Sequence, residues 1–164
     1  MKGKVALVMG GGAGTGRATA MAFAREGARV VVADINETLA QKSVGLIRAA
    51  GGEALAIRAD MAQAADIQAV MEAARTTWGG LHLVSNNAAA APPNKPLAGI
   101  TEEEWDRCMS VTLRGVWLCL KYELPLIEAS GGGAIVNVAS LSGLRGDPHQ
   151  GAYAAAKGGV LALT

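Results

Sequence analysis

The sequence predicts an α/β fold built on a doubly wound parallel sheet, and three observations support this prediction. Short apolar runs alternate with longer helix-like stretches along the chain. Glycines follow the first apolar run, at residues 10–16. A polar side chain follows each of the other runs. Strands that alternate with helices form a parallel sheet with right-handed crossovers and helices on both faces, so we expect a Rossmann-type domain.

Five short segments are expected to be strands. The first is the apolar run Val-Ala-Leu-Val-Met, which is far too short to span a membrane or to form the core of a signal peptide. The second is rich in β-branched residues, which favour strands. In chain order the five segments lie at residues 5–9, 29–33, 53–58, 81–85 and 134–138.

Helices are expected between these strands. Asn36 is a candidate cap for the second helix, and glycine pairs at 51–52 and 79–80 end the second and third helices. Thr101 and Glu104 have the spacing of a capping box, and Pro125 should disturb the end of the helix that they open. The predicted helices cover residues 18–26, 36–50, 64–77, 101–122 and 150–164.

Length and composition limit the classes of protein that the chain can belong to. The 164 residues fit one domain, residues 1–164, and the 15 basic and 14 acidic residues give a net charge of +1. We therefore expect a cytoplasmic protein with no nucleic-acid or membrane partner held by charge. Cys108 and Cys119 are interpreted as core thiols, and His82 and His149 form no metal motif, so no metal site is expected.

The glycine-rich segment after the first strand is a candidate phosphate-binding loop. Gly10, Gly14 and Gly16 have a GxxxGxG spacing, and the GxxxxGK[ST] pattern of nucleoside triphosphatases does not fit. Glycine lets the backbone turn sharply and approach a pyrophosphate, which the N–H groups at the start of the following helix attract. A glycine-rich turn without a ligand is the alternative.

Asp34, at the end of the second strand, is a candidate ribose-binding residue. It lies about twenty residues beyond the glycine loop, and a carboxylate there can accept hydrogen bonds from a ribose diol. It would repel a 2′-phosphate, and its neighbours Ala13, Ile35 and Asn36 offer no compensating positive charge. We therefore expect NAD as the cofactor, with NADP less favoured. The alternative is that Asp34 is only a helix cap.

Tyr153 and Lys157 are a candidate acid/base pair. Their spacing of four places both on one face of the last predicted helix. An ammonium group nearby favours the phenolate, which would let Tyr153 exchange a proton with an alcohol or carbonyl oxygen. Ser140, at the end of the fifth strand, could donate a hydrogen bond to the same oxygen. Taken alone, the pair could also be surface residues without a role.

Together these features resemble the short-chain dehydrogenase/reductase family, over the whole chain and in the family's order. The resemblance implies that Asp60 and the backbone of Met61 border the adenine and that Asn87 lies along the cofactor. The residues implied to hold the pyrophosphate and the adenosine ribose are Gly10, Gly14, Thr15, Gly16 and Asp34. The other matching segments are Asn86-Asn87-Ala88, residues 135–137, Ser140, and Tyr153-Ala154-Ala155-Ala156-Lys157.

The resemblance also assigns the chemistry. Tyr153 would be the acid/base, Lys157 would bind the nicotinamide ribose, and Ser140 would orient the substrate oxygen. Family members usually carry, at the position of Thr112, an asparagine that helps to hold a proton-relay water. Thr112 is shorter and has one donor, so it would either hold this water in a shifted position or impair the relay.

The last departure from the family is the length of the chain. Family members continue beyond the Tyr–Lys helix with further strands, a loop that meets the nicotinamide and a lid over the substrate. We therefore expect a sheet of five strands in the order 3-2-1-4-5, without the family's C-terminal strands, in a fragment of a longer protein. Leu141, Ser142, His149 and residues 90–96 are either part of the remaining substrate pocket or ordinary loop residues.

The resemblance implies an NAD-dependent oxidoreductase that transfers a hydride between a secondary alcohol or ketone and the nicotinamide ring. A truncated, non-catalytic dinucleotide-binding module is the alternative. The resemblance further implies that the intact protein is a homo-oligomer, because the long helix from Thr101 and the Tyr153 helix often form the interface in family members. Met109, Val116, Trp117 and Leu120 could supply apolar contacts there. Burial in the core would explain these four residues equally well.

Overall fold

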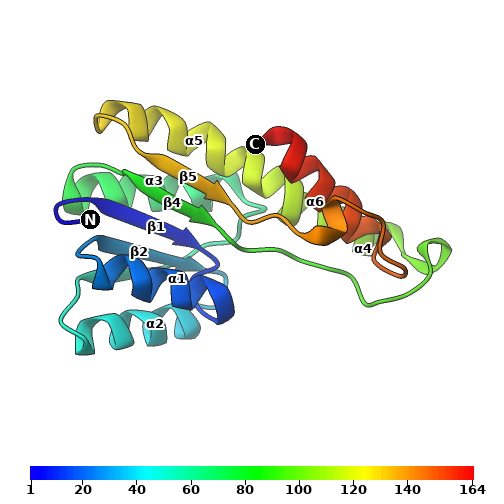
Figure 1. The fold of residues 1–164 in the computed structure, drawn as a ribbon, viewed down its shortest axis with the longest axis horizontal. Helices are drawn as coiled ribbons and strands as arrows, with labels where there is room; N and C mark the ends of the chain where they lie inside the picture. The colour runs from blue at the N-terminus through cyan, green and yellow to red at the C-terminus, as the bar shows by residue number, and fades with distance from the viewer.

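The computed structural model describes residues 1–164 and contains a five-stranded parallel sheet (Figure 1). Its strand order, β3-β2-β1-β4-β5, confirms the predicted topology. The strands are β1 (Val5–Met9), β2 (Arg29–Asp34), β3 (Ala54–Arg58), β4 (Leu83–Asn86) and β5 (Ala134–Asn137). The α-helices are α1 (Gly14–Arg25), α2 (Glu37–Ala49), α3 (Ala64–Trp78), α4 (Glu102–Met109), α5 (Gly115–Ala129) and α6 (Gly151–Leu163). A π-helical turn, η2 (Ser110–Arg114), joins α4 to α5, and two short 3₁₀ turns are η1 (Leu97–Gly99) and η3 (Leu141–Gly143).

Strand β1 occupies the middle of the sheet, and its side chains alternate between two apolar cores. Leu7 and Met9 belong to a core that is shared with α3 and α5. Ala6 and Val8 belong to a second core that is shared with α1 and α2. Helices therefore cover both faces of the sheet, as a doubly wound parallel sheet requires (Figure 1).

The expected helix caps are present. The Asn36 side chain accepts a hydrogen bond from the Leu39 N–H at the start of α2. Thr101 and Glu104 form the predicted capping box at the start of α4, with each side chain bonded to the other's backbone N–H. Gly79 ends α3 in the left-handed conformation, with φ at 85°. These local signals were sufficient to position three helix ends.

Helix α1 begins at Gly14, four residues earlier than the composition suggested. Its first turn contains two glycines, which have low helix propensity, so the sequence pattern concealed the start. The Arg17 N–H nevertheless bonds to the Ala13 carbonyl and closes the first helical turn. The helix N-terminus consequently lies directly after the glycine loop.

The helical run from residue 102 to residue 129 differs from the prediction in two ways. It contains the π turn η2, and it passes through Pro125 and continues to Ala129. Proline inside a helix removes one hydrogen bond at a cost of about 3 kcal/mol. Burial of Ile127 in the core beyond the proline offsets this cost, so the expectation that Pro125 disturbs the helix end was wrong.

The sequence did not decide whether the apolar residues Met109, Val116, Trp117 and Leu120 are buried in the core or exposed at an interface. Val116 is buried in the core, and Leu120 packs against it, whereas the Trp117 side chain is 45% exposed. Cys108 and Cys119 are buried free thiols, as predicted. None of the helices is long and apolar enough to cross a bilayer.

Candidate active site

The carboxyl ends of the strands meet at one edge of the sheet, as parallel register requires. Met9 of β1 pairs with Ala33 of β2 and with Asn86 of β4. Asn86 in turn pairs with Asn137 of β5. The segments that follow the strands therefore converge, which is where ligands bind in sheets of this type.

The glycine loop packs directly against other backbone segments at two positions, where a side chain would not fit. Gly10 has φ at 77°, and a Cβ atom there would lie 2.8 Å from the Ala88 backbone. A Cβ atom on Gly16 would overlap the Gly10 carbonyl oxygen. The start of α1, the loop and the segment after β4 thus approach one another with backbone against backbone, which only glycine allows.

The N-terminus of α1 is open to an anion. Its cap residue, Ala13, offers no side-chain hydrogen bond, and the first turn contains no acidic residue. Gly14 and Thr15 are exposed at this end of the helix. An uncapped helix N-terminus presents unpaired N–H groups and the positive end of the helix dipole, so a pyrophosphate would be stabilised here.

Asp34 faces the glycine loop from the end of β2. Its Oδ2 accepts a hydrogen bond from the Gly12 N–H at 2.8 Å, and its Oδ1 accepts one from the Asn36 N–H at 2.9 Å. Asn36, and not Asp34, caps α2, so the helix-cap alternative for Asp34 is not supported. The two backbone bonds fix the carboxylate and leave each oxygen with a further lone pair.

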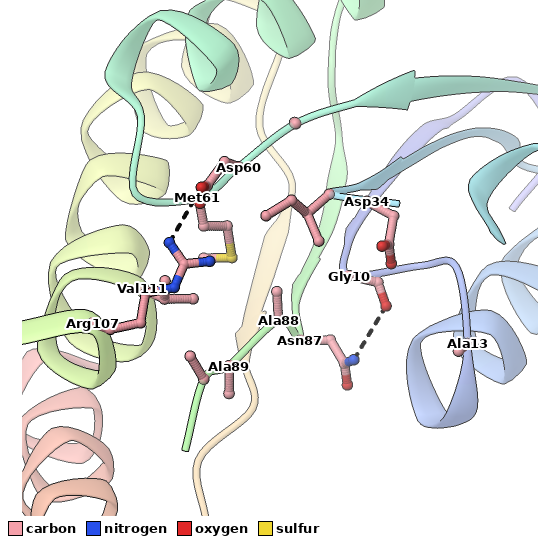
Figure 2. A pocket seen from close by; sticks show the side chains of 13 residues that line it. Gly10, Ala13, Asp34, Asp60, Met61, Asn87, Ala88, Ala89, Arg107 and Val111 are labelled. Atoms are coloured by element: carbon pink, nitrogen blue, oxygen red, sulfur yellow. Dashed lines mark hydrogen bonds and ion pairs between the residues drawn. The ribbon is translucent and has the colours of Figure 1, made fainter. Parts of the chain in front are cut away.

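Asp34 belongs to a pocket of about 380 Å³ along this edge of the sheet (Figure 2). The Asn87 side chain bonds to the Gly10 carbonyl at 3.4 Å on one side of the pocket. Arg107 and Asp60 face each other on the other side, 3.3 Å apart (Figure 2). The pocket is lined by Gly10, Ala13, Asp34, Ile35, Ala59, Asp60, Met61, Asn87, Ala88, Ala89, Ala90, Arg107 and Val111.

Lys157 and Tyr153 lie together on α6. Lys157 is only 2% exposed, and its Nζ donates a hydrogen bond to the Val138 carbonyl just beyond β5. The same Nζ lies 5.8 Å from the centre of the Tyr153 ring. Burial lowers the pKa of the Lys157 ammonium, because the charged form is poorly solvated there. The pair is therefore a buried lysine amino group beside a phenol ring.

Ser140 begins the short turn η3, which packs on α6. Its Oγ accepts a hydrogen bond from the Ser142 N–H at 3.2 Å. A Cβ atom on Gly143 would lie 2.6 Å from the Lys157 backbone, so η3 and α6 meet without an intervening side chain. This contact sets the position of Ser140 relative to Lys157.

The candidate substrate residues fall into different environments. Ser142 is buried, and its hydroxyl donates to Asp147 at 2.6 Å, so it has a structural contact. Leu141 is 69% exposed, and Leu144 nearby is 73% exposed. The His149 carbonyl accepts a hydrogen bond from the Lys95 N–H at 3.2 Å, which ties the loop after β4 to the segment before α6.

Thr112 lies within the π turn and is fully buried. Its hydroxyl donates to the Ala90 carbonyl at 2.9 Å and accepts from the Ala90 N–H at 3.0 Å. Single π turns inside α-helices are frequent at functional sites. The only donor of Thr112 is thus already committed to the backbone, and its role in a proton relay stays a prediction.

A buried polar chain lies behind the ends of β4 and β5. The Asn86 amide donates to Oε2 of Glu123 and to Oδ1 of Asn137, each at 3.0 Å. Two buried acceptors have no partner, Oδ1 of Asn86 and Oε1 of Glu123. Burial raises the pKa of Glu123 to about 7 and raises the pKa of the Cys119 thiol beside it.

The structure thus groups the predicted site residues in two places. Gly10, Asp34, Asp60, Met61 and Asn87 line the pocket, with Gly14, Thr15 and Gly16 at the adjacent start of α1. Tyr153 and Lys157 lie on α6, Ser140 directly precedes η3, which packs on α6, and Thr112 lies apart in η2. Sequence reasoning missed Arg107 and Gly143, because their partners are remote in sequence and no local pattern marks them.

Comparisons with known proteins agree with this geometry. A family model described as short chain dehydrogenase matches residues 4–164. Cyclohexanol dehydrogenase from Acinetobacter sp. (strain SE19) is 45% identical over 98% of this chain and 64% of its own length. A 2,5-dichloro-2,5-cyclohexadiene-1,4-diol dehydrogenase from Sphingobium indicum is 39% identical over 100% of this chain and 65% of its own.

A solved structure shows the same fold. A short-chain dehydrogenase/reductase from Burkholderia phymatum, in complex with NAD, is 34% identical and superimposes with a TM-score of 0.95, over 99% of this chain and 58% of that one. The chain therefore spans about two thirds, or slightly less, of the proteins that it matches.

Proposed function

This chain belongs to the short-chain dehydrogenase family, and from that premise we propose that it binds NAD and oxidises a secondary alcohol, or reduces the corresponding ketone. The observation that carries the proposal is the buried Lys157 ammonium beside the Tyr153 ring. A cation in this position stabilises a phenolate, which is the form that accepts a proton from an alcohol.

The residues of the pocket fit a dinucleotide. The open N-terminus of α1 would hold the pyrophosphate through its N–H groups, and the Gly10 and Gly16 contacts leave the backbone free of side chains there. The free lone pairs of Asp34 would accept hydrogen bonds from the ribose diol. Ile35 and Met61 also line the pocket, and their apolar side chains would contact a flat base.

NAD is the favoured cofactor because of the charges around Asp34. The 2′-phosphate of NADP would be repelled by the Asp34 carboxylate, because both groups are negatively charged. Two arginines lie near Asp34 and both already have partners: Arg58, opposite Asp34 on β3, is paired with Asp66, and Arg17 is bonded to the Gly12 carbonyl and the Ser43 hydroxyl. A solved relative in complex with NAD supports the same choice.

The chemistry follows from the second group of residues. Bound NAD supplies a nicotinamide ring that accepts or donates a hydride. Ser140 would donate a hydrogen bond to the substrate oxygen, and Tyr153 would take the proton of the alcohol as its carbonyl forms. Lys157 would stabilise the Tyr153 phenolate by its charge and would be held in place by the Val138 carbonyl.

A hydroxyl or ketone on a six-membered carbocycle is the substrate class that we favour. Two relatives are named for a cyclohexanol and for a cyclohexadiene diol. The exposed side chains of Leu141 and Leu144 follow Ser140 closely and offer an apolar surface for such a ring.

Cofactor titration followed by a turnover assay tests the proposal. Tryptophan fluorescence of the 1–164 chain should change on addition of NAD more strongly than on addition of NADP. Formation of NADH with cyclohexanol should then be observed, and Tyr153→Phe should lower kcat by about 100-fold or more with NAD affinity unchanged. Binding without turnover would instead support a non-catalytic dinucleotide-binding module. Absence of binding to both cofactors would refute both functions.

A further inference from the structure

The turn after β3 forms the wall of the pocket farthest from the glycine loop, and its first residue is held by several bonds. Asp60 accepts a hydrogen bond from the Ala62 N–H on Oδ1, at 2.9 Å. Its Oδ2 lies 3.3 Å from Nη1 of Arg107. The Asp60 N–H donates to the Asp66 carboxylate, also at 2.9 Å. The Asp60 carboxylate is therefore fixed by one backbone bond and one arginine.

The helical run that carries Arg107 holds the next two residues of the turn as well. Arg114 donates from Nη1 to the Ala62 carbonyl at 3.1 Å. Gly115 packs directly on Met61, since a Cβ atom there would lie 3.0 Å from the Met61 carbonyl oxygen. Three residues of one helical run thus hold three consecutive residues of the pocket wall.

The same run also holds the segment after β4, which lines the pocket as well. Between the two arginines, Thr112 makes two hydrogen bonds to the Ala90 backbone, and Val111 lines the pocket itself. Arg107 is the only cation among the lining residues, and Figure 2 shows it beside Asp60 and Met61. Its side chain is 52% exposed. Its charge therefore acts at the Asp60 end of the pocket and not at the Asp34 end.

We propose that Arg107 is a positioning residue that makes the site selective for a 6-aminopurine base. Held by Arg107 and by the Ala62 N–H, the Asp60 carboxylate presents its remaining lone pairs to the slot beside Met61. An exocyclic amino group donates to such a carboxylate, whereas a 6-oxo group places an acceptor against it and is repelled. This proposal rests on the proposed function, because it needs a dinucleotide in the pocket.

Two dinucleotides that differ at one position of the base test the proposal. The Kd values of the 1–164 chain are measured for NAD and for nicotinamide hypoxanthine dinucleotide, in which a 6-oxo group replaces the 6-amino group. The wild type should prefer NAD by about tenfold or more, as expected for a hydrogen bond to a charged group. Arg107→Gln should reduce this ratio by about threefold to tenfold, with the loss confined to NAD.

Three further variants separate positioning from a general loss of structure. Arg75→Gln is the matched control, because it makes the same change in an exposed ion pair with Glu72 on α3, and its ratio should equal that of the wild type. Arg107→Lys keeps the charge and should give an intermediate ratio. In an Asp60→Asn background, Arg107→Gln should have no further effect on the ratio.

The outcomes distinguish this proposal from the proposed function. An unchanged ratio in Arg107→Gln, or an equal weakening of both ligands, would overturn the role of Arg107 while NAD binding itself still stands. A wild type that binds both dinucleotides equally would also overturn it. A wild type that binds neither would overturn the proposed function, and the present proposal with it.

Discussion

Glu123 is the only fully buried acidic residue, and its surroundings indicate that it holds a proton. As a carboxylate it would leave two acceptors facing no donor, its own Oε1 and Oδ1 of Asn86. As a neutral acid it could donate from Oε1 to Asn86 while accepting the Asn86 amide on Oε2, where a 3.0 Å bond already exists. One proton would thus give both unpaired atoms a partner. Burial favours this neutral form, against the existing hydrogen bond from Asn86, which favours the charged form.

The stability of the protein should consequently depend on pH through Glu123. Its pKa is raised from the usual 4.5 to about 7 in the folded state. Between these values the folded chain keeps a proton that the unfolded chain has released, so the free energy of unfolding falls as pH rises. The loss is complete above pH 7 and amounts to about 3 kcal/mol.

Glu123→Gln tests this dependence, because an amide has the shape and the donor of the neutral acid. The variant should be more stable than the wild type at pH 8, by up to about 3 kcal/mol, and equally stable near pH 4.5. Urea denaturation at both pH values measures the difference. Glu128→Gln, at an exposed position of the same helix, is the control and should track the wild type at each pH. A parallel pH dependence in wild type and Glu123→Gln would show that Glu123 is ionised throughout.

A second prediction at the level of a single residue concerns the Thr112 hydroxyl. The hydroxyl of Thr112 already donates its hydrogen to the Ala90 carbonyl, so it can only accept a hydrogen bond from a relay water. Thr112→Asn supplies two donors and an acceptor, and we expect kcat to rise with the Kd for NAD unchanged. Steady-state kinetics with cyclohexanol measure the first quantity and fluorescence titration the second. Thr76→Asn, on the exposed face of α3, is the control. An unaltered kcat would contradict a relay limited by Thr112.

At the scale of elements, the contact between η3 and α6 joins the turn that follows Ser140 to the helix that carries Tyr153 and Lys157. Gly143→Ala would force these two backbones apart, because the new methyl group would lie 2.6 Å from the Lys157 backbone. Misplacement of a catalytic group by about 1 Å can lower a rate substantially, so kcat should fall about tenfold or more. NAD affinity should change little, since the pocket around Asp34 is not part of this contact.

Gly146→Ala is the matched control for this element. It lies in the same segment, and its Cβ atom would meet no atom within 4 Å. Its kcat should therefore equal that of the wild type. If both alanine variants lowered kcat equally, flexibility of the segment and not the close contact would be responsible.

The helical run from α4 to α5 illustrates what a local pattern cannot predict. The capping box at Thr101 is a relation between residues three apart, and it was predicted correctly. The π turn depends on Thr112 reaching Ala90, which is 22 residues away in sequence. The continuation through Pro125 depends on the burial of Ile127 in a core that distant strands complete. Both features are decided by tertiary contacts.

At the scale of the whole molecule, the sequence predicted the topology of the sheet. It predicted only some of the residues that form the candidate site. The strand order follows from alternating strands and helices, and residues such as Asp34 and Ser140 were found because they follow strands. Arg107 contacts Asp60 across 47 residues, and Asn86 contacts Glu123 across 37. Such pairs carry no signature in a single sequence, although their positions next to predicted site residues could have prompted a search.

The alternation of β1 between two cores has a consequence for how accurately the strand must be aligned. Both faces of β1 are apolar, so within the strand a shift by one residue would only exchange one apolar face for the other. Polarity opposes such a slip only at the start of the strand, where the exposed Lys4 and the buried Val5 would change places. Within the strand, polarity cannot correct it. Side-chain size and the loop must do so, since Leu7 would have to occupy the space of Ala6, and Gly10 would lose its place against Ala88. Gly10, which we propose to border the pyrophosphate, thus also helps to lock the central strand in register.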